Sequence, residues 1–90
     1  MTTFKKKFTI KSNNGWIEPP ERMRCGAAIK TLVDLALEMQ RKNDKTLNLR
    51  IIKSGVRTAK CEIECPDRET YEALKLMFLY EKGTYFDWRG

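Results

Sequence analysis

The sequence predicts a small α+β domain in which two helices pack on one face of an antiparallel sheet. Three observations support this prediction. Apolar residues recur at helical spacing in 25–42 and 68–82, they alternate with polar residues in 7–12, and they alternate again along the hairpin of 47–65. The resulting order is β-α-β-β-α, and a short last strand within 84–88 would complete the ferredoxin-like βαββαβ arrangement.

Length and composition set the class of protein. Ninety residues make one domain, which we expect to span 1–90 around a single small core. The chain is 41% apolar and 33% charged, as is typical of a soluble protein, and no run approaches the roughly 18 apolar residues that cross a bilayer. Cys61 and Cys65 lie four residues apart on one predicted strand, too far for a disulfide. We therefore expect reduced thiols, a cytoplasmic location and no membrane partner.

The first strand and the first helix are separated by a segment that continues neither of them. Residues 7–12 place apolar side chains on one side and polar ones on the other, which predicts a half-buried strand. The turn-forming residues 13–15 end this strand, and the prolines at 19–20 keep the next segment extended. Residues 25–42 then repeat apolar side chains every three or four positions, which predicts an amphipathic helix.

The hairpin that follows, 47–65, has a register that the apolar pattern restricts. A two-residue loop at Ser54 and Gly55 would set apolar against polar residues across the strands, which a sheet with one buried face disfavours. A register shifted by one residue, with Lys53 opposite Arg57, makes the inner face wholly apolar. We therefore expect a loop of three or five residues in which Gly55 adopts a positive φ.

The same register places two cations in direct opposition on the open face of the sheet. Arg50 faces Lys60, and in the ferredoxin-like order the first strand brings Lys7 and Lys11 beside them. Opposed like charges destabilise a strand pair by roughly a few tenths of a kcal/mol, and bound phosphates would relieve that repulsion. No aromatic residue lies within 18–69, so we expect no stacking on bases. The alternative is a basic surface with no specific ligand.

The second helix has a signal at each end. Asp67 precedes it as an N-cap and Gly83 follows it as a C-cap, while Tyr71, Leu74 and Phe78 form its buried stripe. The residues after this helix add the short last strand at a sheet edge.

Two further groups are candidate binding residues. Arg22 and Arg24 precede the first helix, where unpaired amides favour an anion. Aromatic residues outside the expected core form a candidate protein interface. They are Trp16, Tyr85, Phe86 and Trp88. The alternative for these aromatics is that they cover the ends of the core.

The residue types present favour binding over catalysis. The chain has no histidine, so the commonest general base is missing, and we expect no catalytic residue, metal or cofactor. Residues 1–60 hold 14 Lys/Arg against 5 Asp/Glu. The sequence therefore predicts a non-enzymatic binding or regulatory module that contacts nucleic acid or a nucleoprotein complex through a basic sheet face. The open alternative is a protein-binding accessory or inhibitor, of the kind that phages encode, or a self-dimer.

Overall fold

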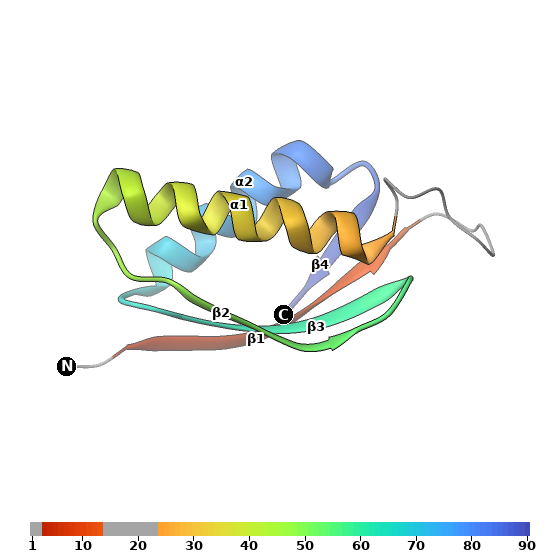
Figure 1. Ribbon diagram of the computed structural model, residues 1–90, viewed down its shortest axis with the longest axis horizontal. Helices are drawn as coiled ribbons and strands as arrows, with labels where there is room; N and C mark the ends of the chain where they lie inside the picture. Colours follow the sequence, from red (N-terminus) through yellow and green to blue (C-terminus); the bar gives the residue numbers. More distant parts are fainter. Residues whose placement is uncertain (1–2, 14–23) are drawn as a thin grey trace.

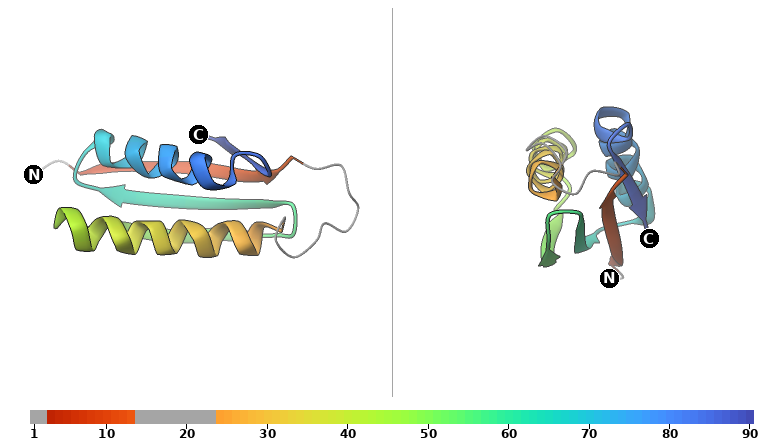
Figure 2. Two further views of the ribbon diagram at one scale, coloured as in Figure 1. Left: turned by 90° about the horizontal axis from the view of Figure 1, so that it is seen from above. Right: turned by 90° about the vertical axis from the view of Figure 1, so that its right-hand side faces the viewer.

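The computed structural model describes residues 3–13 and 24–90, so Trp16 and Arg22 lie outside the described residues. The elements in chain order are β1 (Phe4–Ser12), α1 (Cys25–Asn43), β2 (Asn48–Ser54), β3 (Thr58–Cys65), α2 (Arg68–Lys82) and β4 (Phe86–Arg89). The strands form one antiparallel sheet in the order β2-β3-β1-β4, and both helices cover the same face (Figures 1 and 2). The predicted α+β class is confirmed, and the short last strand is present.

The core lies between the sheet and the two helices. Its largest fully buried side chains come from both helices and from β1, β3 and β4, and they include Phe78, Phe86, Ile10, Leu32, Ile63 and Leu74. Along β3 the side chains alternate between buried positions under the helices and positions on the opposite face. That opposite face has no helix over it (Figure 1). It is called the open face below.

The start of α2 is fixed by the capping residue that the sequence predicts. Asp67 has an extended backbone, and its carboxylate accepts hydrogen bonds from the Thr70 amide (2.8 Å) and hydroxyl (2.6 Å). Lys45, just before β2, forms an ion pair of 3.2 Å with the same carboxylate. The cap therefore joins the beginning of α2 to the loop between α1 and β2.

These contacts predict a pH-dependent stability that Asp67→Asn reduces. Hydrogen bonds from Thr70, and then from Lys45, lower the pKa of Asp67 from 3.8 to about 2. Because the folded-state pKa is the lower one, the carboxylate stabilises the fold above about pH 4, and this contribution is lost as the pH falls through about 2. Urea unfolding between these pH values should show a shallower acid dependence for Asp67→Asn than for the wild type. Parallel pH profiles would contradict this cap.

The hairpin keeps the predicted alternation but not the predicted register. Leu49 lies opposite Ile63 and Ile51 opposite Cys61, so the inner face is apolar as expected. Arg50, however, lies opposite Glu62, and the predicted opposition of Arg50 and Lys60 is wrong. Alternation cannot distinguish registers that differ by two residues, because every side chain keeps its face. The register in the structure has the advantage of pairing opposite charges.

The turn of the hairpin also differs from the expectation. The register shifts by one residue at Ile52, so that Lys53 pairs with Lys60 and Ser54 with Ala59. Residues 55–57 connect β2 to β3, but because the last pair is Ser54 with Ala59, four residues separate the paired positions in place of the expected three or five. The Gly55 amide donates to the Thr58 carbonyl (2.8 Å), and no glycine among the described residues has a positive φ. The extra residue of a bulge in β2 thus keeps the apolar residues of both strands on the inner face. The length of the loop does not have this role.

Candidate nucleic-acid interface

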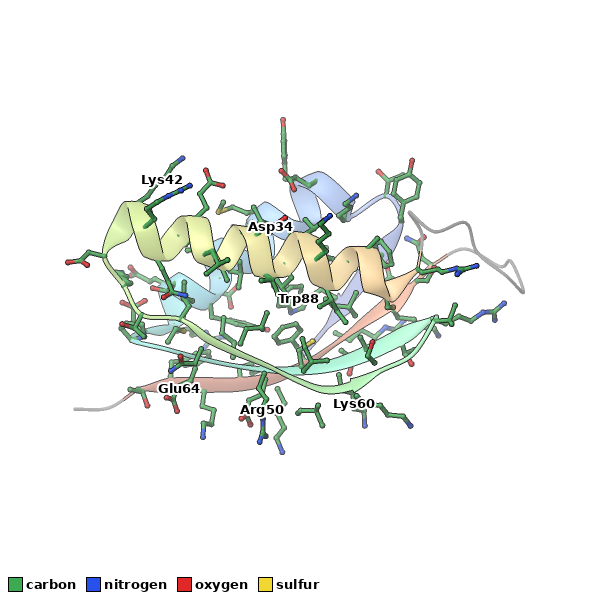
Figure 3. All side chains as sticks on the ribbon, in the orientation of Figure 1. Asp34, Lys42, Arg50, Lys60, Glu64 and Trp88 are labelled. Atoms are coloured by element: carbon green, nitrogen blue, oxygen red, sulfur yellow. The ribbon has the colours of Figure 1, made fainter. Side chains whose placement is uncertain are left out.

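One row of open-face residues crosses all four strands and contains no acidic side chain. Lys53 of β2 pairs with Lys60 of β3, and the neighbour of Lys60 on β1 is Thr9, which in turn pairs with Arg89 of β4. The residues directly before and after Lys60 in β3 are both buried under the helices. Lys60, and the row that it belongs to, therefore lies on the open face. Figure 3 shows Lys60 projecting from the sheet away from the helices. Three of the four side chains in this row are cations.

Two lysines of β1 enlarge this row into a cluster. Lys7 and Lys11 lie two residues before and after Thr9, so they share its face of the strand. We call Lys7, Lys11, Lys53, Lys60 and Arg89 the cationic cluster. Among the residues that the structure describes, none of these five forms an ion pair.

The remainder of the open face differs in charge, because there carboxylates pair with the cations. Arg50 forms an ion pair of 3.2 Å with Glu62, and Lys5 one of 3.6 Å with Glu64. Figure 3 shows Arg50 and Glu64 on the same face as the cluster, toward the other end of the sheet. The open face is therefore charge-paired at one end, whereas at the other end the row of Lys53, Lys60 and Arg89 contains no acidic residue, with Asp87 opposite Lys11 beside it.

A shallow hollow lies over the cationic cluster. It has a volume of about 470 Å³, and the side chains at its rim include Lys7, Lys60, Arg89 and Ile52. Ile52 is 44% exposed and is the residue that the register shift leaves without a partner on β3. The bulge thus places an apolar side chain among cations, where a ligand with both phosphate and apolar groups could contact both.

The structure brings together three of the four cations that the sequence predicts for this face. Lys7, Lys11 and Lys60 lie close together in the sheet register. Arg50 does not belong to this group, because it forms an ion pair with Glu62. Two members of the cluster were not predicted from the sequence. The bulge brings Lys53 opposite Lys60, and the pairing of β4 with β1 brings Arg89 opposite Thr9.

The predicted anion site before α1 is not supported by the geometry around Arg24. The Cys25 amide donates to the carbonyl of Val56 in the hairpin loop (3.0 Å), so it is already occupied. The amides of Ala27 and Ala28 donate to the Arg24 carbonyl. Two amides at the start of α1, those of Cys25 and Ala27, are thus engaged by the chain itself, the first of them by the β2–β3 loop.

The C-terminal aromatic residues do not form an exposed patch. Phe86 is fully buried and Tyr85 is half-buried against the core. The Trp88 ring stacks on Phe8 with centroids 4.0 Å apart, and its indole N–H donates to the Tyr71 hydroxyl (3.0 Å). Figure 3 shows Trp88 between the sheet and the helices. The expectation of a protein interface here is therefore wrong for Phe86, which is fully buried, whereas Trp88 is half-buried because β4 turns these alternate residues toward the core.

The three thiols lie in the core, where burial opposes their ionisation. Burial raises the pKa of Cys61 to about 11 and also raises the pKa of Cys25, so both stay protonated at neutral pH. All three cysteines are buried and free. In residues 3–13 and 24–90, no group of three potential metal ligands is placed to hold an ion.

Comparisons with known proteins add no family. No family model matches this chain, and a search of curated protein sequences found no match. Within the part of the chain that the structure describes, neither helix is long and apolar enough to span a membrane. The functional argument therefore depends on the geometry of the open face.

Proposed function

We propose that the protein is a small module that binds nucleic acid, alone or within a nucleoprotein complex, through the cationic cluster of its open face. The observation that supports this proposal most strongly is the contrast along that face. Carboxylates pair with the cations at one end, whereas the row of Lys53, Lys60 and Arg89 at the other end has no carboxylate partner among the described residues. A row of mutually repelling cations is stabilised when an external anion binds it.

Nucleic acid fits the size of the row. Four adjacent strands cover three steps of about 4.8 Å, or about 14 Å in all, and a duplex presents a phosphate on each strand about every 3.4 Å of its axis. Several phosphates can therefore face the cluster at once. Binding would release the counterions condensed around them, which supplies the favourable free energy.

The open face favours contact with the backbone over reading of bases. The open-face residues of the four strands are charged side chains, threonines and an asparagine, with Ile52 as their apolar neighbour, and none of them is aromatic. Proteins that read single-stranded RNA from a sheet stack bases on aromatic rings. We therefore propose binding by charge and shape, with little dependence on sequence.

Three finer assignments belong to this proposal. The position of β1 between β3 and β4 supports classing the domain as ferredoxin-like, and the absence of histidine supports a binding rather than a catalytic role. Three buried free cysteines favour a reducing, cytoplasmic environment.

A fluorescence anisotropy titration tests the proposal. Labelled 16-base-pair DNA duplexes of unrelated sequence should bind at low salt with dissociation constants that agree within about threefold, because the contacts are to phosphates. An RNA duplex of the same length reports which backbone is preferred. If one duplex sequence binds far more tightly than the others, the backbone-contact account is wrong; if no nucleic acid binds at low salt, the proposed function is wrong.

A further inference from the structure

β2 is an edge strand whose outer side is available for pairing. It stands at the end of the order β2-β3-β1-β4, and within the described residues it pairs only with β3. An unpaired edge exposes a row of amide and carbonyl groups that another strand can bind. Its sequence, NLRIIKS, contains neither proline nor an acidic residue. Without proline, every residue of β2 keeps an amide, and the protection that this edge does carry is its two cations and the bulge at Ile52.

A groove with a partly apolar lining lies at this edge, between α1 and the start of β2. It has a volume of about 280 Å³, and its apolar lining includes Val33 and Leu37 of α1 and Leu49 of β2. Leu37 is 59% exposed and Val33 37% exposed, although both lie on a helix that packs on the sheet. The Gln40 side chain donates to the Leu47 carbonyl (2.9 Å) and ties α1 to the start of β2. Figure 2 shows α1 running alongside the sheet at the β2 side.

The side chains of β2 on the open face are basic. The residues of β3 that pair with β2 indicate which side chains a second partner strand would need. β3 places Glu62 opposite Arg50 on the open face and Ile63 opposite Leu49 on the face under α1. A strand on the other edge of β2 would meet the same alternation, with the cations Arg50 and Lys53 on one side and the groove on the other. The complementary strand therefore alternates carboxylates with apolar side chains.

We propose that the free edge of β2 binds an extended acidic strand of another protein, one that alternates carboxylates with apolar residues. The main chain of that strand extends the sheet, its apolar side chains enter the groove below Val33 and Leu37, and its carboxylates lie beside Arg50 and Lys53. A second copy of this chain is a poorer occupant. Pairing β2 with β2 would bring both cations of each strand together, between molecules that each have a net charge of +6.

The probe for this surface is a peptide that reproduces the pattern of β3. A fluorescein-labelled octapeptide with the sequence TAKVEIEV, which is β3 with valine at both cysteine positions, should bind the full chain in an anisotropy titration. Leu37→Glu should weaken binding at least about tenfold, since it places a charge in the groove. A control peptide with lysine in place of both glutamates should bind the wild type at least about tenfold more weakly.

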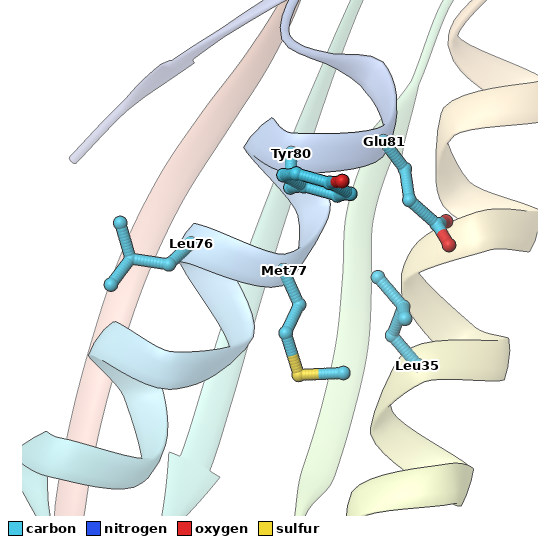
Figure 4. Close-up of a pocket in the computed structure, with 5 residues that line it drawn as sticks. All are labelled: Leu35, Leu76, Met77, Tyr80 and Glu81. Atoms are coloured by element: carbon cyan, nitrogen blue, oxygen red, sulfur yellow. The ribbon is translucent and has the colours of Figure 1, made fainter.

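Two control variants separate this surface from others. Leu76→Glu replaces an equally exposed leucine of α2, beside a separate hollow lined by Leu35, Met77, Tyr80 and Glu81 (Figure 4), and should bind the peptide as the wild type does. Arg89→Glu, which alters the cationic cluster on β4 at the opposite edge of the sheet from β2, should also retain binding. Circular dichroism confirms that each variant is folded.

Four outcomes would overturn the proposal. The first is equal binding by Leu37→Glu and Leu76→Glu, which would place the peptide elsewhere. The second is loss of binding in Arg89→Glu alone, which would mean that the peptide is a general anion on the cationic cluster. The third is a protein-only dimer in analytical ultracentrifugation that Leu37→Glu dissociates, because a second copy would then occupy the edge. No binding of the peptide to the wild type at millimolar concentration contradicts it as well.

Discussion

The double variant Lys53→Glu, Lys60→Glu is expected to bind nucleic acid roughly 10- to 100-fold more weakly than the wild type at physiological salt. The two lysines pair across β2 and β3 at the β2 end of the row of cations, where they are direct neighbours. Reversing both charges removes two phosphate contacts and adds repulsion at the same place. The loss should be similar for different sequences, because the affected contacts are to the backbone.

This pair is a favourable choice because stability should change little. Lys53 and Lys60 are like charges before and after the change, so the cross-strand repulsion persists with its sign unchanged. The matched control is Lys30→Glu, Arg41→Glu, which makes the same change in net charge at exposed positions of α1 in the helix layer. We expect the control to lose far less affinity in the same anisotropy titration. Equal losses would indicate that net charge, and not the cationic cluster, governs binding.

Trp88→Ala is expected to lower the free energy of unfolding by about 3–5 kcal/mol, as for other large aromatic side chains removed from a core. The indole stacks on Phe8, contacts Phe78 at 5.5 Å between centroids, and donates a hydrogen bond to Tyr71. Its removal leaves both a cavity and an unpaired hydroxyl. Because small domains have total stabilities of roughly 5–15 kcal/mol, this change should be visible as a large shift of the urea midpoint.

Tyr80→Ala is the matched control for this prediction. Tyr80 is 93% exposed on α2, so its removal should change stability by less than about 0.5 kcal/mol. The comparison also decides between the two roles considered for the C-terminal aromatics. A Trp88→Ala protein that keeps wild-type stability would show that the indole is a surface group and would contradict the packing described here.

Part of the fold could be predicted because alternation is a local property of the chain. The pattern around Lys60 assigned it to the open face, and the same reasoning placed Lys7 and Lys11 on that face of β1. The N-cap at Asp67 was predictable for a similar reason, since a capping side chain acts within one helical turn. These predictions needed no knowledge of distant parts of the chain.

The composition of the cluster could not be predicted, because it depends on register. Registers that differ by two residues preserve the faces, so the pattern alone could not decide whether Arg50 meets Lys60 or Glu62. The bulge at Ile52, which brings Lys53 opposite Lys60, has no residue-type signal such as a glycine. Opposite-charge pairing of Arg50 with Glu62 was a signal available in the sequence. Weighing it would have corrected the register of that pair.

The most direct test of the central claim is the salt dependence of duplex binding. The logarithm of the association constant of the wild type should fall linearly with the logarithm of salt concentration, with a slope of about −3 to −4, because up to five cations contact phosphates. In Lys53→Glu, Lys60→Glu the slope should be shallower by about 2. A wild-type slope near zero, or equal slopes for the two proteins, would contradict the assignment of the cationic cluster as the phosphate-binding surface.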